Sequence, residues 1–179
     1  VSSRGISDVS GMYFTKFIQS HHAECQPRRF SFEELGFISD KDQRPSQKRI
    51  AFSNIGSWST KEQLPQGIIE DINLGSFLMF QIESSNSWYY EISDRGEDIY
   101  LYRGGGNFTH NSWMKRLAHG ETYTTPYVSL ALGDSLNSVL ENITKYRRHI
   151  CTMCKADSKL PTIFNEYMHL TWDSPSEDI

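Results

Sequence analysis

The chain has 179 residues, a net charge of -4, a hydrophobic content of 37% and an aromatic content of 13%. This length suits one domain with a real core, and the composition excludes a disordered chain. The charge gives no reason to expect nucleic acid as a partner. No apolar run approaches the roughly 20 residues that span a bilayer, and no signal-peptide pattern opens the sequence.

The first half of the chain contains candidate strands between loops. Residues 1–11 are rich in Ser and Gly and indicate a loop. Ser57–Asn73 contains Pro65 and Gly67, which predicts a long loop or an excursion past the sheet edge. The charged stretch Ser39–Gln47 also indicates a loop. Tyr13–Gln19 alternates aromatic and polar residues and indicates a strand, and two further strand candidates are Arg28–Phe32 and Lys48–Ile55.

The aromatic stretch Phe77–Arg103 predicts three strands of a meander, because its apolar runs are separated by turn residues. The runs are Phe77–Glu83, Trp88–Ile92 and Ile99–Arg103. Trp88, Tyr90 and Ile92 share one strand face and Tyr89 and Glu91 the other, since side chains alternate along a strand. Two aromatic faces favour a sheet covered on both sides. Packing and a sugar-stacking surface are both open interpretations.

The second half predicts one more strand and one helix. Gly104–Asn107 indicates a turn; the absence of a following GK[ST] or a periodic helix argues against a phosphate loop. Leu117–Glu121 indicates another turn. Glu121–Leu132 is typical of a long strand, with Pro126 at an edge or a bulge.

Asp134–His149 predicts a helix that Asp134 or Ser135 caps. Its positive C-terminal end suits the helix dipole. An apolar stripe at helical spacing is typical of core packing: Leu136, Val139, Leu140, Ile143 and Tyr146.

Three cysteines carry little functional signal. Cys151 and Cys154 form a lone CxxC after the predicted helix, where neither a zinc site nor a redox pair is favoured, and no metal site is predicted. We interpret these residues and Cys25 as free thiols in a reducing, cytoplasmic setting. Asn107 and Asn142 each begin an N-x-T glycosylation pattern, which is common by chance.

The end of the chain predicts a short apolar strand, Leu160–Asn165, followed by an acidic, Pro-containing stretch. A strand after a helix with no helix behind it is half of a βα unit. We therefore expect Cys151–Lys159 to be a linker and a second domain to begin at Leu160.

These elements together resemble the N-terminal β-domain of the family 36 glycoside hydrolases, the retaining α-galactosidases of bacteria. The resemblance covers most of the chain in order and spacing, although no one motif is decisive. The matching stretches are Ser3-Arg4-Gly5-Ile6-Ser7, Pro65-Gln-Gly67-Ile-Ile-Glu70-Asp71, Trp88-Tyr-Tyr-Glu91-Ile-Ser-Asp94, Leu117-x-x-Gly120-Glu121-x-x-Thr124-Thr125-Pro126 and Leu160-Pro161-Thr-Ile-Phe-Asn165.

The resemblance implies two candidate substrate-binding residues and no catalytic residue. Tyr167 matches a sugar-contacting aromatic by position, usually Trp in the family, and Asp173 matches an acidic loop residue. This chain has Glu166-Tyr167-Met168 where better-known members have Asn-Trp-Glu. A retaining glycosidase needs two carboxylates about 5–5.5 Å apart, and the family's two aspartates lie in later barrel motifs that this sequence lacks. Adjacent carboxylates such as Glu33-Glu34 point to opposite faces of a strand and make poor partners.

We expect an all-β fold, mainly an antiparallel β-supersandwich, with one C-terminal connecting helix. We expect residues 1–150 to form this N-terminal domain, without its first strands and with a linker helix at 134–149. We expect residues 151–179 to form a linker and the first strand of a truncated (β/α)8 catalytic barrel.

Three functions follow as hypotheses. The first is a non-catalytic fragment of an α-galactosidase-like hydrolase, inactive alone, that supports the barrel and oligomer contacts. Its partners would be the rest of the same chain and a second copy, with α-galactoside bound only by the full-length enzyme and no cofactor, nucleic acid or membrane. Trp58 or Trp113 would serve such contacts if exposed, core burial being the alternative. The second is a stand-alone carbohydrate-binding module, and the third an interaction domain with an exposed apolar face.

Overall fold

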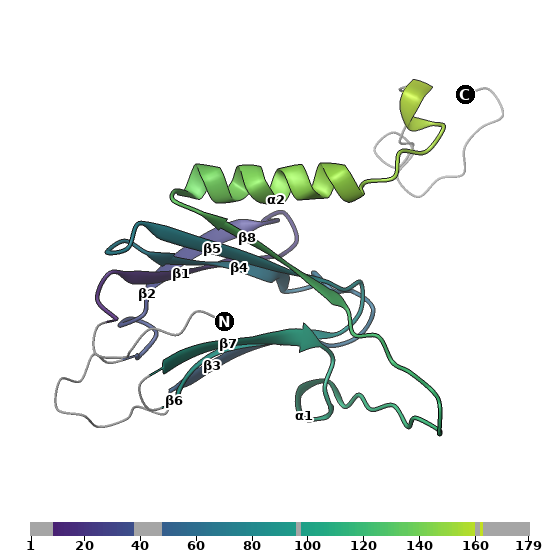
Figure 1. Cartoon of the computed structure of the whole chain (residues 1–179), viewed down its shortest axis with the longest axis horizontal. Helices are drawn as coiled ribbons and strands as arrows, with labels where there is room; N and C mark the ends of the chain where they lie inside the picture. Colours follow the sequence, from purple (N-terminus) through teal and green to yellow (C-terminus); the bar gives the residue numbers. More distant parts are fainter. Residues whose placement is uncertain (1–8, 38–47, 96–97, 160–161, 163–179) are drawn as a thin grey trace. The chain divides into compact units, whose positions relative to one another are not determined.

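The computed structural model describes residues 9–37, 48–95, 98–159 and 162, which build two antiparallel sheets (Figure 1). The larger sheet has five strands in the order β2-β1-β4-β5-β8, and the smaller has three in the order β3-β6-β7. The elements are β1 (Met12–Ile18), β2 (Gln26–Ser31), β3 (Arg49–Asn54), β4 (Gln63–Asp71), β5 (Ser76–Glu83), β6 (Trp88–Arg95), β7 (Asp98–Gly105), α1 (Phe108–Asn111), β8 (Tyr127–Gly133), α2 (Leu136–Ile150) and η1 (Asp157–Lys159). The prediction of a mainly-β, antiparallel fold with one substantial helix near the C-terminus is confirmed.

The chain divides into two compact units, Val1–Tyr146 and Arg147–Ile179. The first contains both sheets and most of α2. The second continues from the end of α2 to η1, where the Cys154 amide donates to Asp157 Oδ2 at 2.7 Å. No helix in the described part of the chain is long and apolar enough to cross a membrane.

The main core lies between the two sheets, and β6 supplies its largest side chains. Trp88 and Tyr90 are fully buried, and so is Phe14 of β1 in the facing sheet. The Tyr90 ring lies 6.2 Å from the Phe14 ring and 5.1 Å from the Phe80 ring. Truncating either large aromatic of β6 to alanine should cost about 3–5 kcal/mol. The aromatic alternation predicted for this strand is therefore confirmed on its inner face, where it serves packing.

The helix α2 covers the outer face of the larger sheet. Val139 and Ile143 are buried in a second cluster with Ile68 and Met79. Ser135 caps the helix as predicted: its Oγ accepts from the Ser138 amide at 3.2 Å, and its amide donates to Ser138 Oγ at 3.1 Å. The predicted apolar stripe is only partly core, because three of its members are exposed: Leu136, Leu140 and Tyr146.

One predicted loop is wrong. Within Ser57–Asn73, the structure places β4 between β1 and β5, so a central strand replaces the expected excursion. Pro65 is tolerated in β4 because it lies at an irregular part of the sheet. The pairing of β1 with β4 shifts register between Lys16 and Ile18, and the pairing of β4 with β5 begins only at Gln66. Proline lacks the amide that a regular ladder needs and is tolerated at such irregularities.

The predicted meander is also wrong in its pairing, although all three of its strands exist. The strand β5 pairs with β4 and β8, whereas β6 pairs with β3 and β7. The turn 84–87 therefore carries the chain from one sheet to the other. The final predicted strand is shorter than expected, because β8 begins at Tyr127, directly after Pro126, and lies at a sheet edge.

Several predicted segments lie wholly or largely outside the described residues. They are the loop Ser39–Gln47, most of the loop 1–11 and the strand Leu160–Asn165. The strands predicted at Tyr13–Gln19, Arg28–Phe32 and Lys48–Ile55 correspond to β1, β2 and β3 within a few residues.

Candidate functional site

The outer face of the smaller sheet gathers aromatic and charged side chains from three strands, and we call it the tyrosine face. It is the face opposite Trp88, Tyr90 and Ile92, which point into the core. The pairing of β3, β6 and β7 arranges it in three cross-strand rows: Arg49, Ser93 and Tyr100; Ala51, Glu91 and Tyr102; Ser53, Tyr89 and Gly104.

The centre of this face is a connected set of polar groups. The Tyr89 hydroxyl donates to the Glu91 carboxylate, and Arg49 Nη1 lies 3.5 Å from Glu91 Oε2. Burial, first of all, together with the hydrogen bond to Glu91 and the charge of that carboxylate, raises the pKa of Tyr89 to about 12, against an opposing effect of Arg49. Tyr89 is therefore a neutral phenol at physiological pH, and Glu91 is already engaged by two donors.

The short helix α1 covers one side of the tyrosine face. His110 stacks on the Tyr89 ring with 4.2 Å between ring centroids and 16° between planes. Asn107 caps α1 by accepting from the His110 amide at 2.8 Å. Asn111 fixes α1 to the sheet, because its Nδ2 donates to the Asn54 carbonyl at 2.8 Å and its Oδ1 accepts from the Asn107 amide at 2.9 Å.

One aromatic ring of the face remains open to solvent. Tyr102 is 58% exposed and lies 5.9 Å from the Tyr89 ring. A Cβ added at Gly104, the next position on the same face, would meet nothing within 4 Å. The face therefore offers one stackable ring beside a carboxylate and a guanidinium. Acid/base glycoside chemistry needs a second carboxylate about 5–5.5 Å away, and Glu91 is the one carboxylate in the three rows.

A second exposed aromatic group lies on residues 112–126, between α1 and β8. Trp113 and Tyr123 contact each other with 5.0 Å between centroids, and Lys115 Nζ lies 5.6 Å from the Tyr123 ring. The predicted turn at Leu117–Glu121 is confirmed by the Glu121 amide, which donates to the Ala118 carbonyl at 3.0 Å. Trp113 is 39% exposed and Trp58 is 63% exposed, so both side chains lie at the surface and neither is buried in the core.

The cysteines and the possible metal ligands do not form a functional site in the part of the chain that the structure describes. Cys25, Cys151 and Cys154 are free and exposed. Among the residues that the structure describes, no three His, Cys, Asp or Glu side chains gather where they could hold a metal ion.

The sequence-predicted substrate residues, Tyr167 and Asp173, lie outside the described residues. The grouping of Arg49, Glu91 and His110 was not predicted. The alternation in β6 placed Tyr89 and Glu91 together, but the pairing with β3 and the position of α1 had no sequence signal.

Searches for relatives return no matching family model, no matching curated protein and no matching solved structure. The fold defines the chain as a mainly-β protein with two facing antiparallel sheets, arranged like a sandwich.

Proposed function

We propose that the chain is the non-catalytic β-domain of an α-galactosidase-like glycoside hydrolase. In this proposal it supports a (β/α)8 barrel formed by later residues, shapes the mouth of the sugar site and supplies oligomer contacts in the cytoplasm. It holds no cofactor and is inactive alone. The α-galactoside is bound by the full-length enzyme, whose barrel is the domain's main partner.

The observation that carries this proposal is the burial of the aromatic motif on β6. Trp88 and Tyr90 belong to a stretch that resembles the family, and both are fully buried between the sheets. Gly67 belongs to another such stretch. A Cβ at Gly67 would lie 2.6 Å from Phe14 Cε2 and 2.9 Å from Phe80 Cζ, so only glycine fits there. Motif residues with architectural roles favour a supporting domain over a sugar-binding platform.

The carboxylates of the described residues support the same proposal, because several have structural partners. Glu70 Oε2 accepts from Arg29 Nε at 2.8 Å, and Arg29 also covers the Tyr13 ring at 3.4 Å. Glu34 Oε2 accepts from the Ser31 amide at 2.6 Å. Asp71 Oδ1 accepts from two amides of the turn that follows β4, each at 3.1 Å. These groups stabilise turns and strands.

The test compares this chain with a longer one that continues into the proposed barrel. The longer chain should hydrolyse an aryl α-galactoside, and this chain should not. This chain should also show no saturable NMR shifts with galactose or an α-galactosyl disaccharide at high millimolar concentration. A longer chain that is folded but inactive on α-galactosides would reject the assignment.

The second candidate function, a stand-alone carbohydrate-binding module, is favoured by Tyr102. Its exposed ring lies in the same cross-strand row as Glu91, and Arg49 pairs with that carboxylate. Sugars bind through such a ring with hydrogen-bonding neighbours. If this module exists, Tyr102→Ala should abolish sugar-induced shifts, whereas Tyr127→Ala, at a tyrosine that is 73% exposed on β8, should leave them unchanged.

A further inference from the structure

In the part of the chain that the structure describes, the two sheets end in four edge strands, and β8 differs from the other three. An exposed edge is a template for pairing with another strand, and proteins protect edges with charged residues or proline. In β8, the sequence Tyr127–Gly133 contains neither. The other edges are protected by Pro27, Arg28 and Arg29 in β2, Arg49 in β3 and Arg103 in β7.

The same strand exposes two leucines on the face that elsewhere forms the core. Leu130 pairs with Phe80, and Leu132 pairs with Leu78. Phe80 is fully buried, yet Leu130 is 48% and Leu132 66% exposed. Val128, on the same face, packs against the main core. The smaller sheet therefore covers the start of β8 and leaves its second half open.

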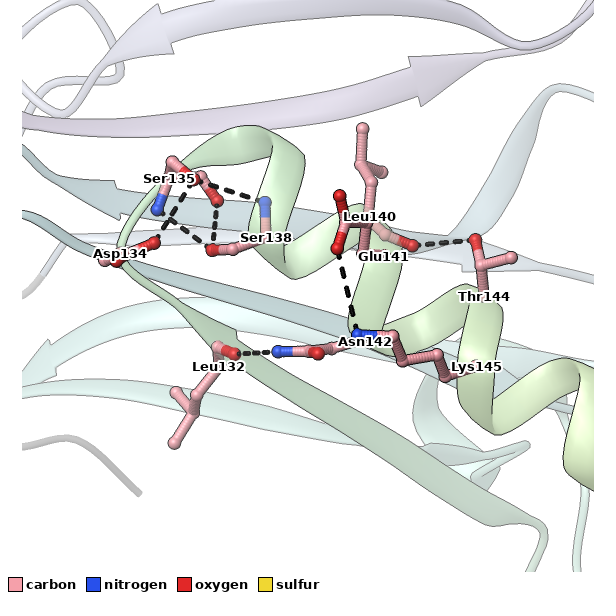
Figure 2. Close-up of polar contacts among 9 residues, drawn as sticks. All are labelled: Leu132, Asp134, Ser135, Ser138, Leu140, Glu141, Asn142, Thr144 and Lys145. Carbon is pink, nitrogen blue, oxygen red and sulfur yellow. Dashed lines mark hydrogen bonds and ion pairs between the residues drawn. The ribbon is translucent and has the colours of Figure 1, made fainter.

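Backbone groups of alternate residues point to opposite neighbours in an antiparallel sheet. The Leu132 carbonyl accepts from Asn142 Nδ2 of α2 at 2.9 Å (Figure 2). This bond places the backbone groups of Leu132, and by alternation those of Leu130 and Val128, on the side of β8 away from β5. At the start of the strand, Pro126 has no amide hydrogen to offer on that side.

We propose that β8 is a homodimer interface, in which the same strand of a second copy pairs with it antiparallel about a two-fold axis at Ser129. Leu130 then lies opposite Val128 of the second copy, and the two strands exchange backbone hydrogen bonds at these positions. Leu132 lies opposite Pro126 of the second copy, which cannot donate to the Leu132 carbonyl. Asn142 of the same copy supplies that missing donor. If the two-fold axis lay at Leu130 instead of Ser129, Leu132 would lie opposite Val128, whose amide would compete with Asn142 for the same carbonyl.

This arrangement is self-complementary and closed, as an isologous contact requires. It gives the exposed leucines an apolar neighbour and leaves no unpaired β8 edge on either copy. The helix α2 does not obstruct it. Val139 and Ile143 pack over Met79 of β5, so with strands about 4.8 Å apart the two α2 helices would lie about 14 Å from each other, beyond the 8–10 Å of contacting helices.

The first test is the mass of the whole chain in solution by light scattering and sedimentation equilibrium. A contact through one strand is smaller than a standard interface, so we expect a micromolar Kd and a mass of twice 20.7 kDa at the highest concentrations. Leu130→Lys should weaken dimerisation on the order of 100-fold. Leu74→Lys is the matched control, because Leu74 is 69% exposed in the β4–β5 turn and its variant should still dimerise. A wild-type chain that is monomeric up to several hundred micromolar, or a Leu130→Lys variant that dimerises normally, overturns the proposal.

The second test fixes the register in a background of Cys25→Ser, Cys151→Ser and Cys154→Ser. The two-fold axis places Ser129 opposite itself in a pair without hydrogen bonds, where Cα atoms lie about 4.5 Å apart. That distance falls in the range for disulfides. Under mild oxidation, Ser129→Cys should form a covalent dimer and Leu132→Cys should not. Absence of the Ser129→Cys dimer, or equal cross-linking of both variants, rejects this register.

Discussion

Replacing Tyr90 by phenylalanine should stabilise the protein, which is the opposite of the usual effect of deleting a core hydroxyl. Tyr90 is fully buried, and its ring contacts Phe52 at 4.9 Å and Trp88 at 5.5 Å between centroids. Its hydroxyl has no hydrogen-bond partner among the residues that the structure describes. Burial also raises the pKa of Tyr90 far above its ordinary value, so the phenol stays neutral.

The size of the effect follows from the desolvation of this hydroxyl. Burying a hydroxyl without a compensating hydrogen bond costs about 1–3 kcal/mol in proteins. Phenylalanine retains the ring contacts and removes that cost, with a small loss where the oxygen filled space. We therefore expect Tyr90→Phe to increase the free energy of unfolding by about 1 kcal/mol.

Urea unfolding followed by tryptophan fluorescence measures this change directly. Trp88 stacks on Tyr90 with 9° between ring planes and reports on the same core. With an unchanged slope, the midpoint should rise by roughly 0.5 M. Tyr102→Phe, at an exposed ring, should leave the midpoint within error. A fall of the Tyr90→Phe midpoint would show that the hydroxyl has a partner in solution and would refute the reasoning.

Two further changes probe other parts of the sandwich. Gly67→Ala should destabilise the protein by about 1–3 kcal/mol, because the new Cβ would meet Phe14 at 2.6 Å; an unchanged urea midpoint would contradict the packing of β4. Because the pKa of Tyr89 rises from 10 to about 12 on folding, the folded state retains its proton longer, and stability should be full below pH 10 and fall between pH 10 and 12. Unfolding free energies measured from pH 9 to 12 should show a shallower fall in Tyr89→Phe, and equal slopes would refute the shift.

Strand positions could be predicted from the sequence because alternation is a local signal. Trp88, Tyr90 and Ile92 were placed on one face, and that face is the core. Sheet partners could not be predicted in the same way, because pairing depends on contacts far apart in the chain. The turn 84–87 looked like a hairpin connection, yet β5 and β6 belong to different sheets. The composition of a turn indicates where a strand ends. It does not indicate which strand pairs with it in the sheet.

The helix shows a related limit of periodicity. The spacing of five apolar residues predicted one core-facing stripe along α2. The structure buries Val139 and Ile143 and exposes Leu136 and Leu140, because a helix on a flat sheet buries a narrower stripe than a helix surrounded by others. Tyr146, at the end of the stripe, turns its hydroxyl to Glu83 Oε1 of β5 at 2.7 Å. The spacing of the apolar residues therefore predicted the helix and its buried side. It did not predict how wide a stripe of the helix packs against the sheet.

The asparagines of the two glycosylation-like patterns both make structural hydrogen bonds. Asn107 is the cap of α1 and accepts from the His110 amide at 2.8 Å. Asn142 donates to the Leu132 carbonyl at 2.9 Å, and Thr144 Oγ1 donates to the Leu140 carbonyl at 2.7 Å (Figure 2). Asparagine is favoured at both positions because its amide can replace a backbone partner at a helix start or a sheet edge. Asn107 therefore serves as a helix cap, and Asn142, from within α2, supplies a donor to the edge strand β8.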